Sequence, residues 1–121
     1  MKLCRRWCIS SHFSNILGFP DDTEDVVLGH LDMLRQIDPA MASFYVLCPI
    51  PGTEQYDDFM RRGLISETNL DRFDTIQPVW DHPHLSKSDR TRLLMRCYKE
   101  FYSFKHTMSK LKWVKNKLKY N

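Results

Sequence analysis

Cys4, Cys8 and His12 recur every four residues near the start of the chain, a spacing that could serve metal chemistry. If this stretch were helical, the three side chains would share one face, and a fourth ligand from elsewhere would complete a site. The spacing matches no common zinc signature, however. We therefore predict no metal ligand here and interpret residues 1–14 as a divergent amino-terminal segment.

Three other side chains have the chemistry of binding sites. His82 and His84 flank a proline in the stretch WDHPHL, where they could bind a metal or contact a substrate, although solvated loop histidines are more common. Cys48 follows an apolar run and could face a pocket, but we favour a buried, inert thiol. No catalytic residue can be named from the sequence.

The carboxyl-terminal segment is strongly basic. Residues 105–121 hold six lysines and no acidic side chain, whereas the preceding residues hold 12 basic and 15 acidic ones. With Trp113 and Tyr120, the lysines could bind phosphate backbones or an anionic membrane surface. A solvated helix face is the alternative that we favour. Apolar residues at helical spacing predict an amphipathic basic segment: Met108, Leu111, Val114 and Leu118.

The composition, with 42% hydrophobic and 27% charged residues, is typical of a soluble globular protein. No apolar run approaches the roughly 20 residues that cross a bilayer, and residues 1–17 lack the apolar centre of an export signal. We therefore expect a cytoplasmic protein whose four cysteines stay reduced. A chain of 121 residues can bury one core.

Hydrophobic patterning predicts the elements that must position any site. We expect strands at 12–19 and 42–47 and helices at 24–37, 54–62 and 86–101. The second strand is apolar on both alternating faces, which is typical of a parallel strand covered on both sides. Apolar stripes on the first and last helices should face the core: Val27, Leu31, Leu34 and Ile37, then Leu93, Leu94, Cys97 and Phe101.

Cap residues define where these helices begin. Asp22 or Thr23 can cap the first helix, Thr53 the second, and Ser86 the third, with Asp89 completing a variant of the capping box. The segment between the second and third helices is irregular, and its Trp80 looks exposed. 

Strands and helices that alternate with short connections indicate parallel βαβ units, so the fold class is α/β. Two strands make too narrow a sheet to stand alone, and we interpret the chain as part of a larger α/β structure. The outer edges of both strands would be unpaired, which favours aggregation unless a partner covers them.

The segment NILGFPDDTEDVVLGHLDMLRQIDPAMASFYVLCPIPGTEQYDDFMRRGLI resembles the closing part of the radical S-adenosylmethionine (SAM) domain, in the branch that often carries a cobalamin-binding domain. In that family a strand ending Ile-x-Gly-hydrophobic-Pro leads into a Thr-Glu helix, and a later strand ends in Pro-x-Pro-Gly-Thr. The resemblance covers residues 15–104, including LDRFD, PVW and RCYKEFY. It implies a partial TIM-type (β/α) barrel with two parallel strands and trailing C-terminal helices, followed by a basic helical tail at 105–121.

The resemblance also implies a binding site. Ile16 would contact the adenine of SAM, and Gly18 and Pro49 would belong to the wall of the same adenosyl pocket. A glycine at a strand end lets the backbone approach a ligand closely, although each of these residues taken alone is also an ordinary core or turn residue. Trp80 would pack against the end of the barrel.

The cofactors of the parent family would be SAM and a [4Fe-4S] cluster, but the cluster ligands are absent from this chain. Cys4 and Cys8 have the first spacing of the Cys-x-x-x-Cys-x-x-Cys motif, whereas its third position is Ser11, a poor ligand for iron–sulfur clusters. A complete barrel also needs about 200 residues or more. We therefore expect a fragment of a radical SAM enzyme that is inactive alone.

Two functions stay open at this point. The fragment would have an unknown small-molecule substrate and the missing part of the barrel as its partner. The alternative is a small non-catalytic module whose basic tail binds nucleic acid or an anionic membrane surface, with nucleic acid the less expected partner.

Overall fold

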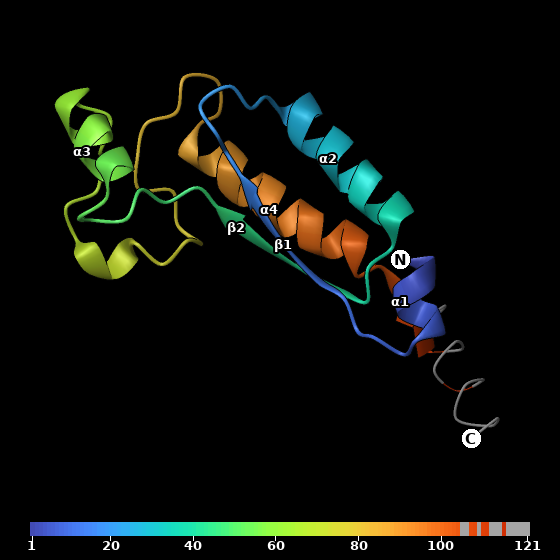
Figure 1. Ribbon diagram of the computed structural model, residues 1–121. Coiled ribbons are helices and arrows are strands. Elements are labelled where there is room, and N and C mark those ends of the chain that lie inside the picture. The colour runs from blue at the N-terminus through green and yellow to red at the C-terminus, as the bar shows by residue number, and fades with distance from the viewer. Residues whose placement is uncertain (105–106, 109, 112–114, 116–121) are drawn as a thin grey trace.

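The computed structural model describes residues 1–104, 107, 108, 110, 111 and 115. Figure 1 shows an α/β arrangement in which two neighbouring strands are flanked by helices. The elements in chain order are α1 (Lys2–Arg6), β1 (His12–Leu17), α2 (Glu24–Ile37), β2 (Met41–Val46), α3 (Glu54–Arg61), the 3-10 helix η1 (Leu70–Arg72) and α4 (Lys87–Phe101).

The two strands pair in parallel, as predicted. Leu17 lies opposite Val46, so both strands finish at the same end of the sheet. β1 stops at Leu17 instead of the predicted residue 19, because Gly18 adopts a φ of +83° and leaves the extended conformation. The chain beyond β2 continues into α3, which lies past this end of the sheet (Figure 1).

Helix α2 has the predicted bounds. Thr23 is its N-cap, and its hydroxyl accepts a hydrogen bond from the Val26 N–H. The stripe formed by Val27, Leu31 and Leu34 is buried, as expected. Ile37 is instead 38% exposed. At 3.6 residues per turn, its side chain lies to one side of the buried stripe and faces partly away from the sheet.

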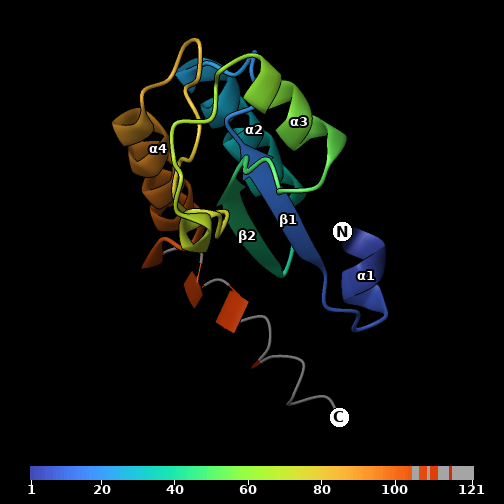
Figure 2. The same ribbon diagram turned by 90° about the vertical axis from the view of Figure 1, so that its left-hand side faces the viewer.

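Helices cover only one face of the sheet in the part that the structure describes. Ala42, Phe44 and Val46 point into the core between β2 and the helices α2 and α4, whereas Ser43 and Tyr45 on the opposite face are partly exposed. Figure 2 shows α2 and α4 together on one side of the strands. The prediction that β2 is covered on both faces is therefore wrong, and we call the exposed side the uncovered face.

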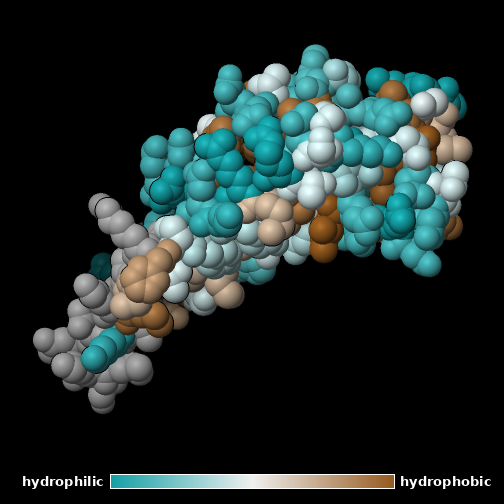
Figure 3. Space-filling view, turned by 180° about the vertical axis from the view of Figure 1, so that it is seen from behind, coloured by the Kyte–Doolittle hydropathy of each residue, from teal (hydrophilic) through white to brown (hydrophobic). Residues whose placement is uncertain are grey.

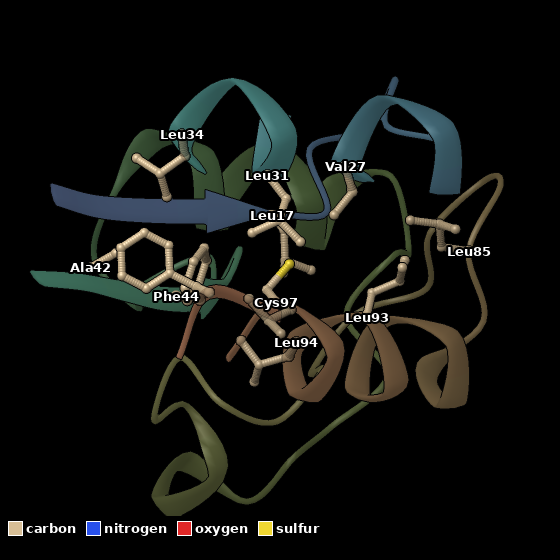
Figure 4. Packing of buried hydrophobic residues seen from close by; sticks show 12 residues of the cluster. Leu17, Val27, Leu31, Leu34, Ala42, Phe44, Leu85, Leu93, Leu94 and Cys97 are labelled. Atoms are coloured by element: carbon tan, nitrogen blue, oxygen red, sulfur yellow. The ribbon is translucent and has the colours of Figure 1, made fainter. Parts of the chain in front are cut away.

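Helix α4 completes the core from the far end of the chain. Ser86 and Asp89 form the predicted capping box, and the predicted stripe on α4 is buried. Figure 4 shows how side chains from β1, α2, β2 and α4 converge. The members of this core cluster are Leu17, Val27, Leu31, Leu34, Ala42, Phe44, Val46, Leu85, Leu93, Leu94, Cys97 and Phe101.

The outer edge of β2 is closed by side chains of α4, which corrects the prediction that both strand edges are unpaired. The Tyr102 hydroxyl binds the backbone N–H and C=O of Ala42, and the Tyr98 hydroxyl binds those of Phe44. The next outward N–H, that of Val46, donates to the Thr75 carbonyl at 2.7 Å. Phenolic hydroxyls both donate and accept, so two tyrosines one helical turn apart satisfy alternate residues of the strand.

A second, smaller cluster forms beyond the strands. It consists of Leu47, Cys48, Phe59, Val79 and Trp80, with α3 contributing Phe59. Trp80 is fully buried, so its predicted exposure is wrong, whereas the expected packing role fits its contacts. Its indole N–H donates to the Leu47 carbonyl at 3.0 Å, and its ring lies 4.7 Å from that of Phe59.

Helix α1 and Lys110 lie near the amino-terminal ends of the strands. Arg5 of α1 donates to the Asp38 carbonyl at 2.8 Å, and Lys110 donates to the carbonyls of Pro39 and Ala40. In the predicted amphipathic segment, Met108 and Leu111 are exposed, whereas Val114 and Leu118 lie outside the described residues. None of the helices in the described residues is long and apolar enough to span a bilayer.

Candidate functional site at the carboxyl ends of the strands

The loop that follows β1 is held by a buried carboxylate. Asp22 is 7% exposed, and its Oδ2 accepts hydrogen bonds from the backbone N–H groups of Gly18 at 2.8 Å and Phe19 at 2.9 Å. The sequence suggested Asp22 only as an alternative N-cap of α2. The sequence signal for this role is an aspartate placed four residues after Gly18 and three after Phe19, where its carboxylate can reach both loop N–H groups.

Gly18 is required by its own backbone and by a neighbouring side chain. Its φ of +83° is strained for any residue with a Cβ. A Cβ at this position would also lie 3.2 Å from Cδ of Arg90 and 3.9 Å from Cγ1 of Val46. The space beside Gly18 in that direction is therefore filled by protein, so packing explains this glycine without a ligand.

Arg90 is a fully buried cation that the sequence did not reveal. Its Nη2 donates to the Trp80 carbonyl at 2.5 Å, and its guanidinium lies 5.1 Å from the centre of the Trp80 ring. Nε and Nη1 make no hydrogen bond with the described residues. Burial lowers the pKa of Arg90, and the charge of Asp81 opposes that effect.

His82 uses both ring nitrogens within the protein. Its Nε2 lies 2.7 Å from the Phe19 carbonyl, and its Nδ1 accepts hydrogen bonds from the backbone N–H groups of His84 and Leu85, each at 3.0 Å. These bonds select the neutral tautomer that carries its proton on Nε2. Because the lone pair of Nδ1 accepts these two hydrogen bonds, His82 holds the loop together. The structure does not support the metal or substrate role that we considered for His82 from the sequence.

The three predicted adenosyl-pocket residues differ in accessibility. Ile16 lies near the end of β1 on the uncovered face and is 50% exposed, whereas Pro49 is almost fully buried. Gly18 is the first residue after β1 and begins the loop. On the core side of β1, a cavity lined in part by Ile16, Asp22 and His30 has a volume of about 30 Å³. Ligand pockets typically have volumes of about 300–1,000 Å³, so this cavity is too small for an adenosyl group.

The cysteines do not form a metal site in the described residues. Helix α1 ends at Arg6, Cys8 has a left-handed φ of 57°, and His12 begins β1, so the continuous helix required to gather Cys4, Cys8 and His12 does not exist. No group of three or more metal-ligating side chains occurs among the residues that the structure describes. These residues therefore do not fit a [4Fe-4S] cluster.

Cys48 lies inside the second cluster and not at an open pocket. Its thiol is buried, and burial raises its pKa. A thiol with a raised pKa is a weak nucleophile, which agrees with the inert role that we favoured.

The comparison with known proteins gives one distant relative. No family model matches the chain. The sequence is 28% identical over 102 residues, or 84% of this chain, to an uncharacterized methyltransferase of Pyrococcus horikoshii. The chain spans only 22% of the length of that protein, so the similarity concerns a part of the methyltransferase.

Proposed function

We propose that this chain is the closing portion of a radical SAM-type (β/α) barrel and contributes one wall of an adenosyl site. The observation that carries the proposal is the parallel pairing of β1 and β2, whose carboxyl ends lie together and leave Ile16 half exposed on the uncovered face. In barrels and open α/β sheets, ligands bind at this end of the strands. The missing part of the barrel would be the partner that completes the site.

The relative supports the same cofactor class. Its name describes a methyltransferase, and SAM is the usual methyl donor of such enzymes. The present chain would supply only one wall of the pocket, because Ile16 is half exposed on the uncovered face, and the small cavity that it helps to line lies on the opposite, core side of β1. It lacks ligands for the iron–sulfur cluster among its described residues, so we derive no radical chemistry for the isolated chain and leave the substrate of the parent enzyme unspecified.

The experiment that tests the proposal is a calorimetric titration of the chain with SAM, using two matched variants. Ile16→Ser removes the proposed contact, and Met41→Ser removes a similarly exposed side chain from the other end of the same face. We expect weak binding that Ile16→Ser abolishes and Met41→Ser preserves. Equal effects of the two variants, or no binding by the unmodified chain, would contradict the proposed site.

A second test concerns the parent gene. Anaerobic iron–sulfur reconstitution should yield no cluster on this chain, and the DNA upstream should encode a Cys-x-x-x-Cys-x-x-Cys motif in a displaced frame. Cluster assembly on the isolated chain would show that our interpretation of Ser11 is wrong.

The second candidate function, a basic module that binds an anionic membrane surface, is favoured by one observation. Phe104, Met108 and Leu111 recur at helical spacing and are 82%, 37% and 56% exposed. Figure 3 shows hydrophobic side chains on the surface at this narrow end of the molecule. Lys110, by contrast, is engaged by backbone carbonyls of the body. Salt-sensitive binding to anionic vesicles that is lost on truncation after Phe104 would support this candidate, and retention on DNA alone would contradict it.

A further inference from the structure

The outer edge of β1 offers unpaired backbone groups. Alternate residues of a strand point to opposite sides of a parallel ladder. The Met41 N–H donates to the Ser11 carbonyl at 2.9 Å and the Leu47 N–H to the Leu17 carbonyl at 2.8 Å, which fixes the residues of β1 that face β2. The N–H and C=O groups of His12, Ser14 and Ile16 therefore point outward, and no described strand lies beside them.

The outer edge of β2, in contrast to that of β1, is already occupied. Tyr98, Tyr102 and the Thr75 carbonyl occupy the outward backbone groups of β2, so a further strand could add only to β1. An extended polypeptide presents donors and acceptors at the repeat of such an edge, so the occupant that fits it best is a further strand.

The sequence of β1 carries none of the usual protection of an exposed edge. The segment HFSNIL contains no lysine, no acidic residue and no proline, and natural edge strands commonly use such residues to prevent pairing. The segment is also suited to pair with itself. About a two-fold axis at Ser14, the two copies of Ser14 face each other, and His12 of each copy lies opposite Ile16 of the other without meeting a like charge.

We propose that the isolated chain forms a dimer in which β1 pairs antiparallel with β1 of a second copy. The outward groups of His12, Ser14 and Ile16 then bond to one another across the two-fold axis, giving a four-stranded sheet with a β2 strand at each end. An isologous contact of this kind closes on itself. Because the tyrosines close both β2 edges, assembly stops at two copies and does not continue into fibres.

This inference does not rest on the proposed function. The missing part of a barrel would occupy the same edge of β1, and the second copy covers that edge when the chain is alone. A monomeric chain that binds SAM would overturn the proposed dimer and support the proposed site. A dimeric chain that does not bind SAM would support the dimer and contradict the site.

The test is sedimentation velocity of the full chain over a range of concentrations. We expect a monomer–dimer equilibrium without larger species. Ser14→Lys should give a monomer with an unchanged circular dichroism spectrum, because two lysines would face each other at the axis. Ser43→Lys, on the same face of the neighbouring strand, is the matched control and should still dimerise. A monomeric wild type, or species larger than the dimer, would overturn the proposal.

A covalent test does not depend on the strength of association. In a chain carrying Cys4→Ser and Cys8→Ser, Ser14→Cys should form an oxidised dimer, because directly opposite, hydrogen-bonded antiparallel residues have Cα atoms about 5.5 Å apart, within the Cα range of a disulfide. Ser43→Cys in the same background should remain uncrosslinked. Equal crosslinking of the two variants would show that β1 is not at the dimer axis.

Discussion

The hydroxyl of Tyr98 lies 3.1 Å from both the backbone nitrogen and the backbone oxygen of Phe44, so one side chain acts on β2 as a neighbouring strand would. Tyr102 repeats the arrangement at Ala42, with distances of 3.0 and 2.7 Å. The edge of Phe44 also packs against the Tyr98 ring, with centroids 5.2 Å apart. Helix α4 and its C-cap residue Tyr102 therefore end the sheet on the β2 side.

Tyr98→Phe should lower the free energy of unfolding by about 1–3 kcal/mol, because the backbone groups of Phe44 lose their partner without a change in side-chain volume. Urea denaturation monitored by circular dichroism measures the effect. Tyr45→Phe is the control, since the Tyr45 hydroxyl bonds to no described residue, and it should leave the midpoint close to that of the wild type. Equal midpoints for the two variants would show that the tyrosine bonds add no net stability.

Replacing both tyrosines should change the size of the assembly. Tyr98→Phe with Tyr102→Phe opens the outward groups of β2, so each copy would have two edges able to pair. We expect light scattering and sedimentation to show species beyond the dimer. Adding Ser14→Lys to this double variant should close the β1 edge again and limit assembly to a β2-paired dimer. A double variant that stays at the wild-type size would contradict the role assigned to the tyrosines.

Gly18→Ala and Gly29→Ala should have opposite effects. At Gly18 the positive φ and the contact with Arg90 should cost about 1–2 kcal/mol or more of unfolding free energy. At Gly29, in the middle of α2, a Cβ would meet nothing within 4 Å, so alanine should add about 0.5–1 kcal/mol. Thermal unfolding of the two variants measures both effects, and a tolerated Gly18→Ala would show that the Arg90 stem readily moves away.

His82 should make stability depend on pH in mildly acidic solution. Burial lowers the pKa of His82 in the folded protein, and protonation of Nδ1 would break its bonds with the N–H groups of His84 and Leu85. The contribution of a group with a lowered folded-state pKa is complete above the unfolded value of about 6.5 and is lost as pH falls through the folded value. His82→Gln should therefore flatten the dependence of the urea midpoint on pH below about 6.5.

The control for this prediction is His30→Gln, because His30 of α2 is exposed and makes no hydrogen bond through its ring with the described residues. Its urea midpoint should follow that of the wild type across the same range. If both variants show the same pH dependence, His82 is not the group responsible.

Arg90→Met and Arg90→Ala separate the charge of this side chain from its volume. Methionine fills similar space without the two nitrogens, Nε and Nη1, that bond to no described residue, so the variant should be within about 1 kcal/mol of the wild type or more stable. Alanine leaves a cavity beside Gly18 and Trp80 and should cost about 2–5 kcal/mol. Equal, large losses in both variants would mean that the bond to the Trp80 carbonyl outweighs the buried charge.

The sequence predicted the features that depend on neighbouring residues. The bounds of α2 and the capping box of α4 arise from side chains within one turn of the helix end, so Thr23, Ser86 and Asp89 were sufficient to find them. The parallel pairing followed from the alternation of strands and helices, a rule of connectivity that applies to the whole fold class.

The sequence did not reveal contacts between residues distant in the chain. Tyr98 meets Phe44 across 54 positions, and Arg90 is buried because the Trp80 segment and the Gly18 loop both fold over it. Trp80 was expected to be exposed, since nothing in its own segment shows that α3 brings Phe59 against it. Such contacts are set by the tertiary arrangement, which local patterning does not determine.

Because the tyrosines occupy the outer edge of β2, the sheet can be extended only on the β1 side, which matters for protein engineering. A fusion partner joined ahead of residue 1 is connected directly to β1, whose outer edge can still form hydrogen bonds, whereas the outer edge of β2 is already occupied by Tyr98 and Tyr102. A design that extends this sheet should therefore add polypeptide before His12 and should keep Tyr98 and Tyr102 as the boundary on the β2 side.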